Sequence, residues 1–346
     1  MVAYPLLPVN DRSAGGAEQI LWSLERELTA RGHITEVAAC AGSKVSGKLI
    51  ETGKVRAHRS EGIAEREREH TERVLAACAS GRFDLVLDHS GHFFRHAAKV
   101  ECHVLATLHL PRVLYPADIF QNPAKNLYFN CVSQSQLAEF RDLPRMTSVV
   151  RNGVDLRRFP IGRRRADYLM WLGRVCPEKA PHLAIQAAQK AGMPILLAGQ
   201  VYPFPSHQQY WAREVKPLID HDRVRWAELP EFEQKAKMLR EARALLVTSQ
   251  IAETSSLAAL EAMACGTPVI GFPVGALKEV VTEETGFLVE NVEAMAKACS
   301  QLRNVRSLSC RERVQREFSI SAMADAYETL IHDLEEQKRW EERRDS

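Results

Sequence analysis

Two glutamates, Glu253 and Glu261, are separated by seven residues and could act together on one ligand. A helix is expected to begin between them, near Ser256 and Leu257, so that its unpaired backbone N–H groups point toward Glu253. Such amides bind phosphate, and a carboxylate accepts hydrogen bonds from pairs of hydroxyl groups. The spacing therefore suits an anionic ligand that carries hydroxyls, such as a sugar nucleotide. The alternative is a chance pair of solvated glutamates.

Two cations, Arg174 and Lys179, flank Pro177 on a short loop. The apolar run at 168–172 predicts a buried strand before them, and Gly173 allows a tight exit from it. Arginine offers a planar fork of donors and lysine a mobile point charge, and hydrogen bonds to a charged partner contribute about 1.5 to 3 kcal/mol each. The loop therefore predicts a diphosphate clamp. The alternative is two solvated surface cations.

Two adjacent glycines, Gly15 and Gly16, precede a predicted helix that Gly32 ends. Apolar residues at 20, 21, 24 and 28 form one face of this helix. The glycines would let a phosphate approach the backbone, although any loop after a strand can carry them for conformational reasons. No G-x-G-x-x-G motif follows, which disfavours a dinucleotide oxidoreductase. Only residues 1–4 are available for a first strand, so either that strand is short or the chain begins late.

Apolar runs alternate with helical stretches along the chain, which favours two parallel sheets covered by helices. In such sheets, ligands bind beyond the carboxyl ends of the strands, where the strand order reverses. The glycine pair, the two cations and Glu253 each follow a predicted strand. The predicted strands are 35–39, 85–87, 104–108, 128–132, 148–150, 168–172, 195–198, 224–226, 244–247 and 269–271.

The order and spacing of these motifs resemble the family-4 retaining glycosyltransferases. The resemblance covers most of the chain and is carried also by Leu108-His109, 131–134, 150–155 and 285–289. It implies an α/β fold of the GT-B type, in which two Rossmann-like parallel-sheet domains face a central cleft. It also implies transfer of a hexose-like unit from a nucleotide-diphospho-sugar to an acceptor hydroxyl, with retention of the anomeric configuration.

The resemblance assigns a role to each motif. Glu253 would hold the sugar and Glu261 the ribose, while the two cations and the helix N-terminus would stabilise the leaving diphosphate. The catalytic residues predicted in this way are His109, Glu253, Arg174 and Lys179. The predicted donor-binding residues are Gly15, Gly16, Arg174, Lys179, Ser256, Leu257 and Glu261.

Three residues, Asp88, His89 and His109, are predicted on the acceptor side. Each follows a strand, and in the resembled family the position of His109 lies beside the transferred sugar. Two alternatives remain open. His109 could be a structural hydrogen-bonding group, and Asp88 could form a turn with Ser90 and Gly91 through local backbone bonds. The acceptor itself, whether a glycan, a lipid-linked molecule or a small molecule, stays unassigned.

The chain departs from the family pattern at Glu253-Thr254-Ser255-Ser256, where Glu-Gly-Phe-Gly is usual. Glycine lets backbone amides approach the sugar closely, so hydroxyl-bearing residues could change which sugar fits. A smaller departure is the single Gly275, where a pair of glycines is common.

We expect neither a metal nor a cofactor in the reaction, because the resembled family uses cations on the protein. Asp220 and Asp222 have the Asp-x-Asp spacing of metal-dependent glycosyltransferases, but acidic residues are common in a loop before a strand. Two other functions remain open: a nucleotide-sugar epimerase of the same architecture, which needs no acceptor, and a non-catalytic nucleotide-sugar binder.

At 346 residues the chain exceeds the size of a single hydrophobic core, so two domains are expected. We predict an acceptor-side domain at 1–160, a nucleotide-sugar domain at 161–320, and a helix with a charged tail at 321–346. The segment 163–167 is interpreted as the linker, and the charged stretch 65–70 as the solvated face of a helix.

The composition is that of an ordinary globular protein, with 45% hydrophobic and 26% charged residues. A net charge of +2 argues against nucleic acid as a main partner. The eight cysteines include no C-x-x-C pair and are expected to be buried in a reducing compartment. No apolar run is long enough to span a bilayer. We therefore expect a cytoplasmic protein, either free or peripheral to the membrane.

Overall fold

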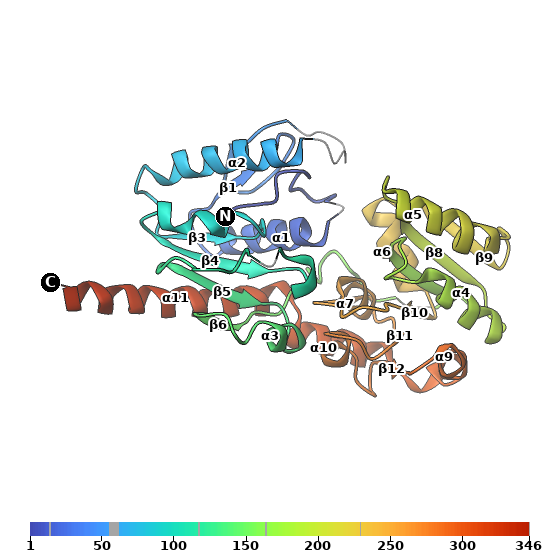
Figure 1. The fold of residues 1–346 in the computed structure, drawn as a ribbon. Coiled ribbons are helices and arrows are strands. Elements are labelled where there is room, and N and C mark those ends of the chain that lie inside the picture. The colour runs from blue at the N-terminus through green and yellow to red at the C-terminus, as the bar shows by residue number, and fades with distance from the viewer. Residues whose placement is uncertain (14, 55–61, 117, 163–164, 229, 346) are drawn as a thin grey trace. The chain divides into compact units, whose positions relative to one another are not determined.

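The computed structural model describes residues 1–13, 15–54, 62–116, 118–162, 165–228 and 230–345. They form two compact units, one of Met1–Gly153 with Ile320–Ser346 and the other of Val154–Ser319 (Figure 1). Each unit is a parallel α/β structure, as predicted, and each is described by itself. The shared cleft stays a prediction.

The sheet of the first unit is completed by the N-terminal residues. Val2 forms parallel bridges to Ala38 and to Asp88, and its N–H donates to Leu87 O at 2.8 Å. This short segment joins the pair β1-β2 to the run β3-β4-β5-β6. The first strand is therefore short but occupies the central position between β1 and β3. The strands are β1 Glu36–Ala39, β2 Lys48–Glu51, β3 Leu85–Asp88, β4 His103–Leu108, β5 Leu127–Cys131 and β6 Met146–Val149.

Four α-helices of the described residues belong to the first unit: α1 Gly16–Ala30, α2 Ile63–Cys78, α3 Gln134–Glu139 and α11 Ile320–Asp345. The C-terminal helix α11 packs along α1. Its Tyr327 is buried and shares a hydrogen bond of 2.8 Å with Thr107 of β4, while Arg31 bonds Asp325 at 2.6 Å. The final helix is thus an integral part of the first unit.

The second unit contains a six-stranded parallel sheet in the order β12-β11-β10-β7-β8-β9. The chain starts at the centre, builds outward through β8 and β9, and then returns to add β10, β11 and β12 on the other side of β7. This is the doubly wound order, and its reversal point lies between β7 and β10. The strands are β7 Leu169–Arg174, β8 Ile195–Gln200, β9 Val224–Glu228, β10 Ala244–Val247, β11 Val269–Gly271 and β12 Gly286–Leu288.

Helices cover both faces of this sheet. One buried cluster includes Met170, Leu245 and Leu260, and the other includes Leu169, Leu246 and Ile185. Neighbouring residues of one strand thus point into opposite clusters, as the two-residue period of a strand requires. The α-helices are α4 Pro181–Lys190, α5 Pro205–Tyr210, α6 Phe232–Glu241, α7 Leu257–Ala264, α8 Leu277–Val280, α9 Val292–Cys299 and α10 Ser307–Glu317.

Three sequence interpretations need correction. Arg165 does not act as a linker but bonds Gly266 O at 3.1 Å and Ser307 Oγ at 2.6 Å within the second unit. Arg163 and Arg164 of the same interpretation lie outside the described residues. The charged stretch of α2 is not wholly solvated, since Arg66 and His70 are buried. Strands β2 and β12 were not predicted.

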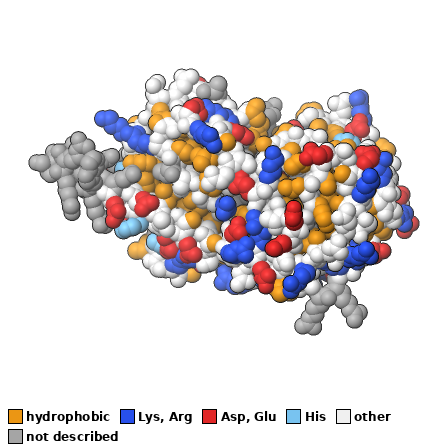
Figure 2. All heavy atoms as spheres, turned by 90° about the horizontal axis from the view of Figure 1, so that it is seen from below, with side chains coloured by type: hydrophobic (Ala, Val, Ile, Leu, Met, Phe, Trp, Pro, Cys, Tyr) orange, Lys and Arg blue, Asp and Glu red, His pale blue; other side chains and the backbone are white. Residues whose placement is uncertain are grey.

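Surface and thiol features agree with the composition. Positive and negative side chains are interspersed over the face drawn in Figure 2. The eight cysteines are free thiols, and all but Cys78 are buried. Among the described residues, no helix has the length and apolar character to cross a membrane.

Candidate functional site

The loops after β7 and β10 meet at the reversal point of the second sheet. The buried hydroxyl of Thr248 donates to the carbonyls of Lys179 and Ala180, each at 2.9 Å. The N–H of Gln250 donates to Glu178 O at 2.7 Å. These bonds fasten two loops that are about seventy residues apart in sequence, and they place both at the edge where ligands bind in open parallel sheets.

Within these loops, Lys179 and Glu253 form an ion pair. The Lys179 Nζ lies 2.5 Å from Glu253 Oε1, and Ser249 Oγ also bonds this oxygen. The side chains are 29% and 10% exposed, so the pair is shielded on the glutamate side and open on the lysine side. The lysine can therefore reach an anionic ligand while the carboxylate stays fixed.

Gly275 holds the loop after β11 against the same glutamate. The Ala276 N–H donates to Glu253 O at 2.7 Å, and Gly275 has φ +53°. A Cβ atom at this position would lie 2.5 Å from Glu253 N, far inside van der Waals contact. Three loops thus converge on Glu253, and one of them can do so only with glycine at 275.

Helices α4 and α7 both start after a residue in the left-handed region. Ala180 has φ +45° and Ser256 has φ +54°, and neither is glycine. Ser256 occupies the last position of the family's Glu-Gly-Phe-Gly pattern, so the conformation that favours glycine is kept while the glycine is lost. Non-glycine residues held in this region cost about 1 to 3 kcal/mol and are frequent at ligand sites.

Ser256→Gly is expected to stabilise the protein. Relief of the left-handed strain outweighs the greater chain entropy of unfolded glycine, giving about 0.5 to 1 kcal/mol more free energy of unfolding. Chemical denaturation measures this change. The matched control is Ser255→Gly, because Ser255 is buried beside it without a positive φ and should lose stability instead. Loss of stability in both variants would contradict the strain at 256.

Glu261 is engaged by a lysine that the sequence did not point to. It lies buried on α7, and Lys235 Nζ of α6 approaches its Oε1 to 2.6 Å. The ammonium group also lies over the rings of Phe159 and Phe232, at 5.6 and 5.3 Å from their centroids. The carboxylate that was predicted to bind ribose is therefore preoriented by a cation held between aromatic rings.

The other predicted donor-side residues are placed as follows. Arg174 is exposed at the end of β7, with its guanidinium carbon 5.8 Å from the Tyr202 ring centroid. Leu257 is the first residue of α7, as predicted to within one position. Gly15 is the residue before α1 and Gly16 is its first residue, but the carboxyl group of Glu18 occupies the space where a Gly15 Cβ would lie. A phosphate would have to displace that carboxyl group, whose pKa is raised by burial.

The two predicted histidines of the first unit lie together at the ends of β3 and β4. His89 Nδ1 and His109 Nε2 are 2.9 Å apart, and the rings stack at 5.2 Å between centroids. Burial lowers the pKa of His109 to about 4 and takes that of His89 well below its usual value. Both rings are therefore neutral near pH 7, and such a pair can orient a hydroxyl group or relay a proton.

Two predicted acidic positions form turns. Asp88 is fully buried, and its oxygens accept from Ser90 N, Ser90 Oγ and Phe94 N at 2.6 to 2.8 Å. These are the local bonds of the turn alternative, and Asp88 is therefore a structural residue beneath His89. Asp220 likewise accepts from the N–H groups of Asp222 and Val224. Asp220 thus shapes the turn before β9, while the expected absence of a metal stays a prediction.

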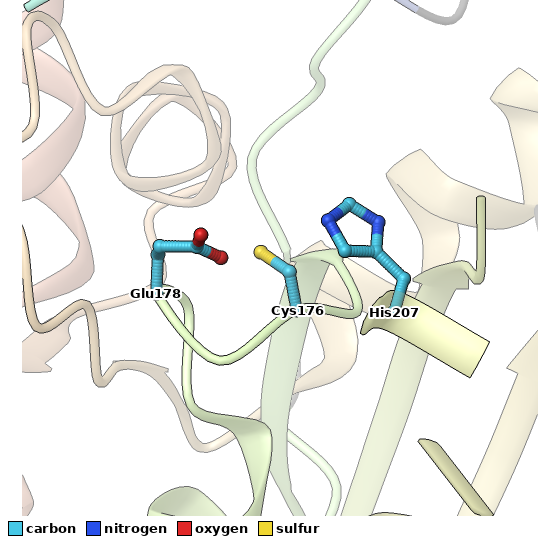
Figure 3. A group of neighbouring side chains, drawn as sticks. All are labelled: Cys176, Glu178 and His207. Carbon is cyan, nitrogen blue, oxygen red and sulfur yellow. The ribbon is translucent and has the colours of Figure 1, made fainter. Parts of the chain in front are cut away.

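The described residues hold one further chemical cluster in the second unit. Cys176, Glu178 and His207 place one potential ligand atom each within 4.8 Å of one another (Figure 3). Sequence reasoning did not single out any of the three. The only available signal was the Cys-Pro-Glu spacing in the loop after β7.

Comparison with known proteins identifies the segment that carries this site. Residues 166–304 match the family model described as glycosyl transferases group 1. This segment is similar to that family, and the match covers less than half of the chain. A curated relative, D-inositol 3-phosphate glycosyltransferase of Geodermatophilus obscurus, is 38% identical over 169 residues, which is 42% of this chain and 37% of that protein. The chain spans less than two thirds of the length of the curated relatives that it matches first.

Solved structures extend the likeness to the whole fold. Sucrose-phosphate synthase from Thermosynechococcus elongatus has a TM-score of 0.80 at 22% identity, over 96% of this chain and 98% of that chain. Anabaena Alr3699/HepE in complex with UDP-glucose has a TM-score of 0.73 at 15% identity, over 95% and 98%. At these identities the likeness concerns the fold, which is the GT-B type predicted from the sequence.

The matched segment, 166–304, contains Arg174, Lys179 and both glutamates of the predicted donor site. Gly15, Gly16, Asp88, His89 and His109 lie outside the matched segment, in the first unit. The match covers part of the predicted donor site, and the roles of the donor-side and acceptor-side residues all stay predictions.

The buried histidine pair predicts an acid-sensitive first unit. A histidine whose folded pKa is about 4 and unfolded pKa about 6.5 takes up its proton more readily when unfolded, so stability is full above pH 6.5 and falls as pH drops toward 4. At pH 5 the loss for His109 is about 2 kcal/mol. We expect His109→Gln to flatten the pH dependence of the unfolding free energy between pH 7 and 5. An unchanged slope, equal to that of the exposed control His332→Gln, would refute this.

Proposed function

We propose that the protein is a retaining glycosyltransferase of family 4, which transfers a sugar from a nucleotide-diphospho-sugar to an acceptor hydroxyl. The observation that carries the proposal is the Lys179–Glu253 pair. It joins a mobile cation to a fixed hydroxyl acceptor at the reversal point of the sheet, within the segment that matches the glycosyl transferases group 1 model. A diphospho-sugar needs these two groups side by side.

The donor is proposed to lie across the loops after β7 and β10. Arg174, Lys179 and the N-terminus of α7 would bind the diphosphate, Glu253 the sugar hydroxyls and Glu261 the ribose. A uridine diphosphate sugar is the first donor to test, since a protein of the same fold was solved with UDP-glucose. The acceptor is proposed to approach the neutral pair His89 and His109, which can accept and donate hydrogen bonds to a hydroxyl.

During transfer the anomeric C–O bond to the diphosphate breaks, and a bond forms from the acceptor oxygen to the anomeric carbon on the same face. Negative charge grows on the leaving diphosphate while the sugar gains positive character. Lys179, Arg174 and the α7 amides are aimed at the first of these charges, so they stabilise the transition state more than the ground state. The acceptor proton leaves with the diphosphate product. We propose no cofactor and no metal for this step.

An epimerase of the same architecture would convert the donor with no acceptor, and fold alone does not separate the two activities. The test has two stages. A thermal-shift screen of nucleotide sugars first finds the donor, because a ligand selective for the folded state raises the melting temperature. The selected donor is then incubated with and without hydroxyl acceptors, including inositol phosphate, the acceptor in the relative's name.

Acceptor-dependent release of nucleoside diphosphate with a new glycoside of retained configuration is the expected result. Conversion of the donor sugar without acceptor would instead establish the epimerase. Binding of a nucleotide sugar with no turnover across the acceptor set would establish the non-catalytic binder.

A further inference from the structure

We propose that Cys176, Glu178 and His207 form a binding site for one zinc ion, which takes no direct part in the proposed sugar transfer. The three side chains each offer a ligand atom, and those atoms lie within 4.8 Å of one another. Figure 3 shows them side by side, two from the loop after β7 and one from α5. Thiolate, carboxylate and imidazole are the three ligand types that zinc prefers in proteins.

Two buried polar atoms of this cluster lack a hydrogen-bond partner among the described residues. They are Nδ1 of His207 and Oε2 of Glu178. His207 is only 8% exposed, and Cys176 is fully buried. Buried polar atoms without a partner destabilise the folded state, so a ligand that binds both atoms is favoured. A cation coordinated by the imidazole and the carboxylate satisfies both at once.

The surroundings hold the ligands in place. The His207 ring packs edge-on against Phe204 at 5.2 Å and beside Tyr202 at 6.4 Å between centroids. Cys176 is anchored by its Sγ contact of 3.6 Å to Arg174 O. In a tetrahedral zinc site, ligand atoms lie about 3.3 to 3.6 Å apart, given bond lengths of about 2.0 to 2.3 Å. Closure therefore needs side-chain shifts of about 1 Å, and a fourth position remains for water.

The charges of the cluster permit a divalent ion. Arg174 acts electrostatically on all three groups, which opposes a cation. A thiolate and a carboxylate carry two negative charges, however, and exceed that single positive charge. Burial raises the pKa of the Cys176 thiol, so zinc must displace its proton.

Two of the three proposed zinc ligands lie between the two predicted diphosphate cations in the sequence. Cys176 and Glu178 belong to the loop that connects Arg174 to Lys179, and Gln250 N–H bonds Glu178 O. Zinc would therefore stiffen this loop without touching the diphosphate itself. Its role is structural or regulatory, and differs from the metal ions that bridge diphosphate in other glycosyltransferases.

The test is titration of the purified full-length protein with Zn²⁺ by calorimetry, and with Co²⁺ by absorption spectroscopy. We expect one Zn²⁺ per chain and a thiolate-to-cobalt charge-transfer band. Cys176→Ser should abolish the band, and His207→Gln should weaken Zn²⁺ binding at least tenfold. The matched control is Cys78→Ser, which removes the most accessible thiol in the other unit and should leave both signals unchanged.

Arg174→Gln should change the affinity for Zn²⁺ in the opposite direction. Removing its charge should tighten Zn²⁺ binding, whereas any general damage to the loop would weaken it. Circular dichroism without metal checks that each variant is folded, and His207→Gln serves if Cys176→Ser fails to fold. The proposal is overturned if the wild-type protein gives no cobalt–thiolate band, or if Cys176→Ser and His207→Gln both bind Zn²⁺ as tightly as the wild type.

Discussion

Lys179→Ala should lower kcat/KM for the nucleotide-sugar donor by ten- to a hundredfold. The lost interaction corresponds to about 1.4 to 2.8 kcal/mol of transition-state stabilisation, at about 1.4 kcal/mol per tenfold change. The reason is geometric: the Nζ of Lys179 is the charge that three fastened loops place beside Glu253. Steady-state kinetics with the donor varied at fixed acceptor measures the effect.

Lys190→Ala is the matched control for this result. Lys190 is a lysine of α4, about half exposed, and its partner Glu293 is 64% exposed at 3.1 Å. Exposed pairs of this kind contribute about 0 to 1 kcal/mol, so the kinetics should stay those of the wild type. Equal activity of both variants would remove Lys179 from the site.

A second readout separates a direct contact from damage to Glu253. If Lys179 binds the diphosphate, its removal should weaken binding of UDP more than binding of uridine, measured by calorimetry. If the variant acts only by leaving Glu253 without its cation, the affinities for UDP and uridine should fall together or not at all. The first pattern is expected, because 29% of the lysine side chain is open to solvent and can meet an anion.

The sequence predicted those parts of the fold that depend on local patterns. The apolar positions between 20 and 28 place a buried face on α1, and Gly32, with φ +97°, follows its end as predicted. The run before Thr248 is a fully buried strand and the run before Arg174 a largely buried one, because helices cover a central parallel strand on both faces. Length, periodicity and glycine position suffice for such elements.

Strands β2 and β12 escaped prediction for a physical reason. Each lies at the edge of its sheet and has only four and three residues, respectively. The pattern of β2, Lys48-Leu-Ile-Glu51, has charged ends and no fully buried residue. Edge strands are specified by the neighbour that pairs with them, so their signal is outside their own sequence. Val2 is a similar case, because its strand character comes only from the bridges to the two strands beside it.

The candidate site divides in a similar way. The motif residues could be found because they follow strands at regular positions. Lys235, which pairs with Glu261, and His207, which meets Cys176, could not, since their partners lie 26 and 31 residues away and on other elements. Asp88 shows the converse, because its sequence fits a site and a turn equally well. Only the three bonds to Ser90 and Phe94 distinguish the two.

Gly275→Ala should damage the second unit severely at the loop that carries Glu253. The added Cβ meets the backbone of Glu253 at 2.5 Å from its N atom and Ala252 at 2.9 Å, and φ is +53°. Backbone atoms have little freedom to move, so steric overlap adds to left-handed strain. We expect a loss of about 2 to 5 kcal/mol in the free energy of unfolding, together with loss of donor binding, because the loop that carries Glu253 must shift.

Gly192→Ala separates the two contributions. Gly192 also has a left-handed φ of +67°, but a Cβ there would meet no atom within 4 Å. This variant should therefore lose only the strain, about 1 kcal/mol, and keep donor binding. Chemical denaturation and calorimetric titration of the donor measure both effects. If Gly275→Ala costs no more than Gly192→Ala, the contact between the loop after β11 and Glu253 is not what positions the glutamate. If Gly275→Ala lowers the free energy of unfolding more than Gly192→Ala and abolishes donor binding, Gly275 alone has the role that a pair of glycines has in the resembled family.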